Sequence, residues 1–156
     1  MTLYYADTSA LVKRYVDEVG STWMREQADP QTGHSLMTSR MTEVEIFSVL
    51  DRRRREVNIG MSDYELISTD FAAHCVNEYE FIELTTSVVA VACGLLEKHP
   101  LRAYDAVQLA SALIANDSLM AARLPELIFL SADDRLLVTA QEEGLSIDNP
   151  NQHPCT

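Results

Sequence analysis

Short apolar runs alternate along the chain with longer segments in which apolar side chains recur at helical spacing. The short runs predict strands, at residues 3–6, 34–38, 81–82, 128–130 and 145–147. The longer segments predict helices, at residues 9–16, in a second segment that ends by Asp29-Pro30, and at residues 41–55, 62–77, 86–98, 103–116 and 133–143. Because strand and helix alternate with connections long enough for crossovers, the pattern predicts a mostly parallel sheet with helices on both faces.

The length and composition fit one compact domain. The chain has 156 residues, of which 47% are hydrophobic and 23% are charged, and this is enough to bury a full core. We expect a single domain over residues 1–148 and a loose tail over residues 149–156, because the tail has two prolines and little apolar content. The apolar stretch Leu84–Leu96 is too short to span a bilayer. No signal-peptide pattern is present at the N-terminus, so we expect a cytoplasmic protein without membrane contact.

The charge and the cysteines limit the classes of function. With 24 acidic and 12 basic side chains, the net charge is −12, which argues against broad electrostatic attraction to nucleic acid. That argument weakens if the acids surround a bound cation, because the cation reverses the local sign of the charge. The three cysteines lack the spacing of a zinc site, and Cys75 and Cys93 fall within apolar helical patterns, so we expect core thiols.

Acidic side chains occur where the predicted sheet would bind a ligand. In an open parallel sheet the ligand crevice lies outside the carboxyl ends of the strands, which is where Asp7 and Asp133 fall. Each of them is also a good helix cap, and capping alone explains such an aspartate well. Asp105 falls in the first turn of its helix, where the helix dipole favours a carboxylate. Glu45 lies in mid-helix between apolar neighbours, and an exposed position explains it equally well.

The four acids carry more information together than singly. Two lie at strand ends that face the crevice, and two lie on helices that can pack beside it. Converging carboxylates repel one another and raise their pKa values, and a bound cation removes that cost. Mg²⁺ and Mn²⁺ prefer oxygen ligands, typically a few carboxylates and waters. Such a site suits phosphodiester hydrolysis, because the metal lowers the pKa of a bound water, orients it and neutralises the developing charge.

Four segments carry these acids, and each resembles one of the four acidic motifs of PIN-domain nucleases. The segments are Y-Y-A-D-T-S-A-L-V-K-R-Y (4–15), E-V-E-I-F-S-V-L-D-R-R (43–53), L-R-A-Y-D-A-V-Q-L-A-S-A-L (101–113) and F-L-S-A-D-D-R-L-L (129–137). Their order and their context agree with the family over most of the chain. Within it, the chain most resembles the VapC-type toxins of bacterial toxin–antitoxin pairs, which are single PIN domains of about this length.

The resemblance implies a three-layer α/β/α sandwich, Mg²⁺- or Mn²⁺-dependent endoribonuclease activity on RNA, a homodimer, and inhibition by a cognate antitoxin that enters the active site. Carried over by position, the catalytic and metal-binding acids are Asp7, Glu45, Asp105 and Asp133. Asp134 would replace Asp133 only if the register slipped by one, and the D-D-R-L context favours Asp133. Residues 115–126 look like a local lengthening before the last motif, which leaves the position of that loop open.

Other polar and basic residues are weaker candidates for contact with phosphate or with metal-bound water. Those in or close behind the first motif are Thr8, Ser9, Lys13 and Arg14. The run Arg52–Arg55 is typical of a solvated helix end, and RNA contact is its less favoured interpretation. Arg102 either forms an ion pair in the site or covers the start of its helix.

A second hypothesis comes from a different class of function. In it, the chain is a catalytically weak PIN fold that acts as a binding or regulatory protein, and its acidic pocket docks a basic partner. The net charge of −12 favours this hypothesis modestly. An interpretation of all four acids as caps and surface charges is the least favoured, because the acids share one motif context.

Overall fold

A computed structural model describes residues 1–154, which form one five-stranded sheet in the order β3-β2-β1-β4-β5. All neighbouring strands in this sheet run parallel. The strands are β1 (Leu3–Ala6), β2 (Ser35–Ser39), β3 (Tyr79–Ile82), β4 (Ile128–Leu130) and β5 (Ser146–Asp148).

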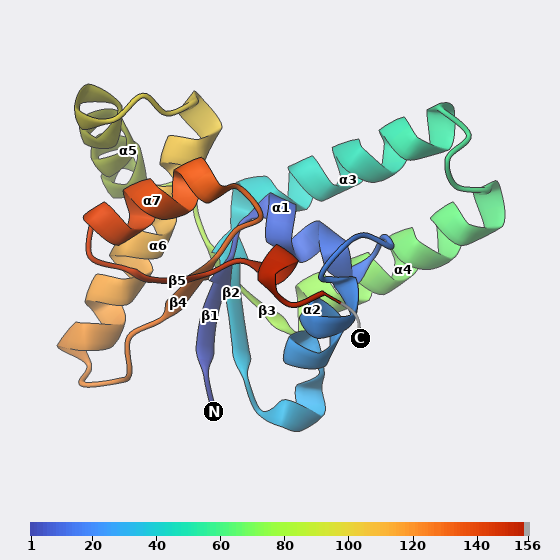
Figure 1. Ribbon diagram of the computed structural model, residues 1–156, viewed down its shortest axis with the longest axis horizontal. Coiled ribbons are helices and arrows are strands. Elements are labelled where there is room, and N and C mark those ends of the chain that lie inside the picture. Colours follow the sequence, from blue (N-terminus) through green and yellow to red (C-terminus); the bar gives the residue numbers. More distant parts are fainter. Residues whose placement is uncertain (155–156) are drawn as a thin grey trace.

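Helices cover both faces of the sheet (Figure 1). One face carries α1 (Thr8–Leu11), α2 (Ser21–Ala28), α3 (Arg40–Arg55) and α4 (Met61–Asn77), and the other carries α5 (Thr86–Lys98), α6 (Ala103–Ala121) and α7 (Asp134–Glu142). The connections include the 3-10 helices η1 (Val12–Arg14), η2 (Pro30–Thr32) and η3 (Pro150–Gln152). The expected three-layer α/β/α sandwich with a parallel sheet is therefore confirmed.

Strand β1 lies at the centre of the sheet, and its side chains are buried on both sides. Successive side chains of a strand point to opposite faces. Tyr5 therefore packs in the core beneath α5, α6 and α7, stacked on Phe129 with ring centroids 5.6 Å apart. Tyr4 and Ala6 pack in the second core, beneath α1 to α4. A strand covered on both faces needs a continuous apolar run, which is what residues 3–6 provide.

The strand order reverses beside β1. The chain runs from β1 to β2 and β3 on one side, and later crosses to β4 on the other side. In open α/β sheets, ligands bind outside the carboxyl ends of the strands at such a switch point. Asp7 directly follows β1, and Ser131 directly follows β4. The topology therefore brings both residues to the crevice at the switch point.

Helix α5 is less buried than its composition predicts. It packs on α6 with one side only, and Val89, Cys93 and Leu96 are exposed. Cys75 of α4 is half-buried, so the expectation of core thiols is wrong for Cys93 and only partly met by Cys75. Neither α5 nor any other helix within residues 1–154 is both long and apolar enough to cross a bilayer.

The lengthening expected at residues 115–126 is mostly helix. Helix α6 continues to Ala121, beyond the end expected at Asn116. The side chain of Asn116 accepts a hydrogen bond from the backbone N–H of Leu127 at 3.0 Å. This bond fixes the loop close to the start of β4, at the end of the sheet opposite the crevice.

The described part of the C-terminal tail is packed, in contrast to the expected loose segment. Asn149 and Pro150 are buried, and Pro150 begins η3. The ring of His153 stacks on Trp23 of α2, with centroids 4.2 Å apart and planes 6° from parallel. Prolines suit the first position of a helix because their fixed φ is already helical. Residues 155–156, including Cys155, lie outside the described residues.

We expect Gly20→Ala to lower the free energy of unfolding by about 2–4 kcal/mol. Gly20 has a φ of +84°, and a Cβ there would lie 2.3 Å from the backbone oxygen of Pro150. Both the left-handed backbone and the docked tail therefore require glycine. Gly94→Ala is the matched control, because nothing lies within 4 Å of a Cβ there, and alanine should stabilise helix α5 by about 0.5–1 kcal/mol. Urea unfolding measures both, and equal stability of the two variants would contradict the expectation.

Candidate functional site

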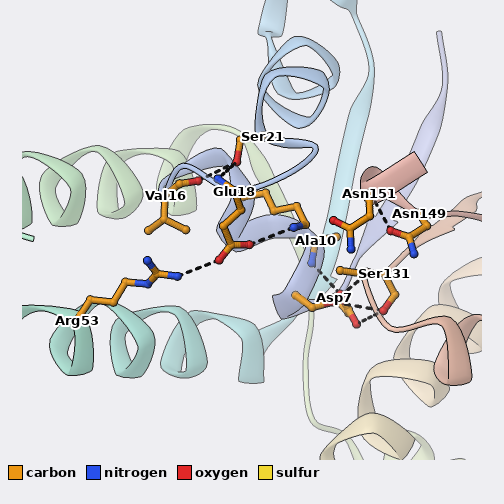
Figure 2. A network of polar contacts seen from close by, with 12 residues as sticks. Asp7, Ala10, Val16, Glu18, Ser21, Arg53, Ser131, Asn149 and Asn151 are labelled. Carbon is orange, nitrogen blue, oxygen red and sulfur yellow. Dashed lines mark hydrogen bonds and ion pairs between the residues drawn. The ribbon is translucent and has the colours of Figure 1, made fainter. Parts of the chain in front are cut away.

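Asp7 caps helix α1 and is held by three donors at the carboxyl end of β1. Its Oδ1 accepts hydrogen bonds from the backbone N–H of Ala10 at 3.0 Å and from the hydroxyl of Ser9 at 2.7 Å. Its Oδ2 accepts from the hydroxyl of Ser131 at 2.7 Å. Figure 2 shows Asp7 between Ala10 and Ser131. The capping role is therefore real, and it also fixes the carboxylate at the switch point.

The Asp7 carboxylate is only 5% exposed. Burial raises its pKa from 3.8 to about 6, although the hydrogen bonds from Ser131, Ser9 and Ala10 act in the opposite direction. Asp105 raises the pKa of Asp7 further through charge repulsion. A carboxylate that is buried at this cost is a candidate for a functional group.

Ser131 was not identified as a site residue by the sequence analysis. Its hydroxyl also accepts a hydrogen bond from the backbone N–H of Asp133 at 3.1 Å. The hydroxyl of Ser9 accepts from the backbone N–H of Ala132 at 2.9 Å. Ser9 and Ser131 thus tie the end of β1 to the end of β4. A serine directly after a buried strand is the only local signal that pointed to Ser131.

Glu45 projects from the middle of α3. Its Oε1 is buried and accepts no hydrogen bond from any residue within the described part of the chain. Burial raises the pKa of Glu45 and the charge of Asp7 adds to the effect, whereas the nearby Thr8, Tyr104 and Gln108 side chains act in the opposite direction. An orphaned buried carboxylate oxygen is costly, so this oxygen is suited to a ligand that supplies positive charge or a proton donor.

Asp105 and Asp133 lie on the α5–α7 side of the same crevice. Asp105 is half-buried in the first turn of α6, and burial followed by repulsion from Asp133 raises its pKa. Asp133 is exposed and caps α7, where its Oδ1 accepts from the backbone N–H of Arg135 at 2.9 Å. Asp134 instead accepts a hydrogen bond from Asn149 Nδ2 at 2.8 Å. The charge that acts on Asp105 is therefore that of Asp133, whereas Asp134 is bonded to Asn149.

These couplings place the four acids in one neighbourhood. In addition to burial, the charge of Asp105 raises the pKa of Asp7, and that of Asp7 raises the pKa of Glu45. No three His, Cys, Asp or Glu side chains within residues 1–154 lie close enough together to hold one metal ion as they stand. The oxygen donors and the orphaned Glu45 Oε1 nevertheless fit the ligand chemistry of a hard divalent cation, which would offset the repulsion between the carboxylates.

A buried polar network lies beneath the acids and was also missed. Gln108 of α6 donates to the hydroxyl of Thr42 at 2.9 Å and to that of Thr8 at 3.3 Å, and its Oε1 accepts from the Tyr5 hydroxyl at 2.7 Å. Thr42 lies one turn before Glu45, and Gln108 lies one turn after Asp105. The network therefore joins the two helices that carry acids. Thr8 belongs to this buried layer.

Tyr104 is a further residue at the crevice that sequence reasoning missed. Tyr104 is 44% exposed. Burial of the hydroxyl and the nearby charges of Glu45, Asp105 and Asp7 raise its pKa to about 12. The hydroxyl therefore stays protonated and can donate a hydrogen bond beside the acids. The sequence shows that Tyr104 directly precedes Asp105, but it does not indicate that the Tyr104 side chain lies beside the acids.

Lys13 and Arg14 do not reach the acids. Lys13 is buried and pairs with Glu18 at 3.0 Å, and Glu18 also pairs with Arg53 at 2.9 Å (Figure 2). Arg14 pairs with Glu78 at 2.7 Å, next to the amino end of β3. Both cations are already neutralised, which leaves their predicted contact with phosphate without structural support.

The four arginines at the end of α3 point in different directions around the helix and differ in their contacts. Arg53 and Arg54 pair with acids, Arg54 with Asp51 at 3.1 Å. Arg52 and Arg55 are exposed and form no ion pair within residues 1–154. Arg52 lies two helical turns beyond Glu45 and hence on the same side of α3. Of this run, Arg52 is thus the residue that faces the same way as the acid.

Comparisons with known proteins agree on the fold. A family model described as PIN domain matches residues 4–142. The chain is similar to a structure of a toxin–antitoxin complex from Klebsiella pneumoniae, with 14% identity, a TM-score of 0.56, and coverage of 94% of this chain and 97% of that one. It is also similar to VapBC2 from Rickettsia felis bound to a promoter DNA fragment (10% identity, TM-score 0.63, coverage 95% and 98%). A third similar structure is FitAB bound to a DNA fragment (11% identity, TM-score 0.63, coverage 96% and 95%). No curated protein matches the chain significantly.

Proposed function

The chain belongs to the PIN-domain family, and on this premise we propose that it is a divalent-metal-dependent endoribonuclease that hydrolyses RNA phosphodiester bonds. PIN domains are a family of nucleases, which supports a hydrolase acting on nucleic acid. The observation that carries the proposal is the buried Asp7 carboxylate at the switch point, held by three donors and coupled to Asp105 and Glu45. Such a group is costly without a cation beside it.

In this proposal Asp7, Asp105 and Asp133 would hold Mg²⁺ or Mn²⁺, and Glu45 would complete the set or orient the attacking water. A bound ion of this kind supplies a Lewis acid and lowers the pKa of a water bound to it. The buried Glu45 Oε1, which accepts no hydrogen bond within residues 1–154, is free to accept one from a water. Tyr104 keeps its proton, and its hydroxyl interacts with the Glu45 carboxylate, so it helps to orient Glu45.

The remaining polar residues act as positioning groups. Ser9 and Ser131 fix both oxygens of Asp7 and join the ends of β1 and β4. Gln108 and Thr42 hold α6 against α3, so Asp105 and Glu45 approach the crevice from fixed directions. Rigid supporting contacts of this kind decide whether a set of catalytic groups keeps its geometry.

The proposed biological role is that of a toxin held by a cognate antitoxin. The proteins of similar fold are described as toxin–antitoxin, VapBC2 and FitAB complexes. We extend that partnership to this chain, together with the expected homodimer and cytoplasmic location. The exposed apolar side of α5, with Val89 and Leu96, supports a protein partner because such a surface is unfavourable in water.

Metal-dependent cleavage tests the proposed activity. We expect the purified protein to cut single-stranded RNA with Mg²⁺ or Mn²⁺, to stop in EDTA, and to leave single-stranded DNA of the same sequence intact. Mn²⁺ at about 100 times its Kd should add about 2.7 kcal/mol of stability by mass action, a rise in Tm of about 5–10 °C. Cleavage that continues in EDTA would exclude the metal mechanism.

The second candidate function is a catalytically weak PIN fold that docks a basic partner. Two observations favour it: the net charge of −12, and the lack, within residues 1–154, of three ligand groups already close enough for one ion. The Tm measurement separates the two functions. No rise in Tm with millimolar Mn²⁺, together with no cleavage, would replace the nuclease by the binding protein.

A further inference from the structure

The arginines that are left without acidic partners are not spread evenly over the molecule. Most basic side chains form ion pairs, as expected in a chain with 24 acidic residues. Within residues 1–154 those that form none are Arg52, Arg55, Arg102, Arg123 and Arg135. Two of these, Arg102 and Arg135, line one pocket of about 150 Å³ together with Asp105 and Asp133.

The pocket lies at the carboxyl end of the sheet, between the start of α6 and the start of α7. Arg102 is the N-cap residue of α6 but forms no side-chain capping hydrogen bond. Arg135 lies in the first turn of α7, directly after its capping residue and Asp134. The nearby Arg102 acts against the rise in the pKa of Asp105 but stays outside ion-pair distance. Both guanidinium groups are exposed and therefore accessible to a ligand.

Local helix energetics do not explain these two positions. The amino end of a helix carries partial positive charge, which disfavours cations and favours anions. The same chain uses acids or hydroxyls to cap α1, α3, α5 and α7. Two arginines without acidic partners at two adjacent helix starts therefore point to an anion that binds both.

We propose that Arg102 and Arg135 form a phosphate subsite for single-stranded RNA, which holds the phosphate next to the scissile one. This inference rests on the proposed nuclease function and deepens it. Guanidinium groups bind phosphate through paired N–H donors. The two acids of the pocket belong to the proposed metal site, so a cation there offsets their repulsion of the strand. A chain with net charge −12 has little general attraction for RNA, and a local pair of cations then matters more.

The test compares Arg102→Gln/Arg135→Gln with wild type and with Arg123→Gln. Arg123 is likewise exposed and outside the ion pairs of residues 1–154, but it follows α6 near the amino end of β4. We expect the double variant to raise KM about tenfold at nearly unchanged kcat. Arg123→Gln should match wild type. Lysines at the two pocket positions should restore part of the affinity, because they keep the charge but lose the planar fork.

Binding is measured separately from cleavage. A short fluorescein-labelled single-stranded RNA is titrated by anisotropy against the protein with all four acids intact, with and without the two arginine changes. Ca²⁺ replaces Mn²⁺ in this titration, because it takes the same carboxylate and water ligands in a larger and looser shell. We expect the slope of log affinity against log salt to fall by about 0.7 for each arginine removed. Thermal melts should show no fall in Tm for any arginine variant, because the side chains are exposed and a cation at a helix start is unfavourable.

The possible results separate the two proposals. The subsite is supported if the double variant loses RNA affinity and Arg123→Gln does not. This result supports it even if the wild-type protein cuts no RNA and the nuclease function fails. An unchanged KM and salt slope, an equal loss in Arg123→Gln, or no RNA binding by either protein would overturn the subsite. A fall in kcat with KM unchanged would overturn it too, because the arginines would then act on the chemistry and not on binding.

Discussion

Asp7→Asn is expected to abolish RNA cleavage while it makes the metal-free protein more stable. Asparagine keeps the shape and can still accept from the N–H of Ala10, so the cap survives. It removes the charge that the proposed cation needs, and we expect kcat to fall by more than about 100-fold, the upper range for loss of a supporting metal contact. Cleavage assays with Mg²⁺ or Mn²⁺ measure this effect.

The gain in stability follows from the pKa of Asp7. Burial raises this pKa from 3.8 to about 6 in the folded protein, so the folded state binds the proton more tightly than the unfolded state does. The stabilisation by the protonated form is fully present below about pH 4 and is lost as the pH rises through about 6. At about pH 7 in EDTA, the asparagine variant should therefore be more stable by up to about 3 kcal/mol, and the difference should vanish near pH 4.

Asp134→Asn is the matched control, because it changes the same group in the same crevice region but at a carboxylate that accepts from Asn149. We expect it to keep nearly full activity. Equal activity of Asp7→Asn and wild type would remove Asp7 from the mechanism. An Asp7→Asn protein that is less stable than wild type at neutral pH would contradict the cost assigned to its burial.

Gln108→Leu is expected to lower the free energy of unfolding by about 2–4 kcal/mol. Leucine fills similar space but leaves the buried hydroxyl of Tyr5 without the acceptor that Gln108 provides, and Thr42 keeps only its hydrogen bond from Thr38. A loss of this size corresponds to a fall in Tm of about 5–15 °C for a chain of this length. Because Gln108 and Thr42 join α6 to α3, kcat should also fall more than KM changes.

Gln141→Leu is the control for that substitution. Gln141 is exposed on α7, so the same change should alter stability by less than about 0.5 kcal/mol. Urea unfolding and cleavage kinetics are measured on both variants. If Gln108→Leu keeps the stability and kcat of wild type, the network beneath the acids has neither a structural nor a positioning role.

The sequence by itself determined the layered fold and the places of the acids along it. Apolar runs of strand length alternate with helical periods, and this order leaves a parallel sheet with helices on both faces as the simplest arrangement. Asp7 and Asp133 were predictable as strand-end residues because capping residues mark the strand-to-helix junctions. Their two interpretations, cap and site residue, are compatible: the hydrogen bonds that cap a helix also fix a carboxylate at the crevice.

Only the tertiary structure decided which side chains meet. The orphaned Glu45 Oε1, the Ser131 contact with Asp7 and the Gln108 network depend on packing between segments far apart in the chain. The ion pairs that remove Lys13 and Arg14 from the crevice, and the one-sided burial of α5, depend on it as well. Local periodicity specifies which residues share a face of one element, but the partner of that face is set by the fold. The sequence therefore determined which four acids are candidates and that two of them lie at strand ends. The tertiary structure decided which groups donate hydrogen bonds to these acids, which charges repel them and which arginines lie beside them without an ion pair.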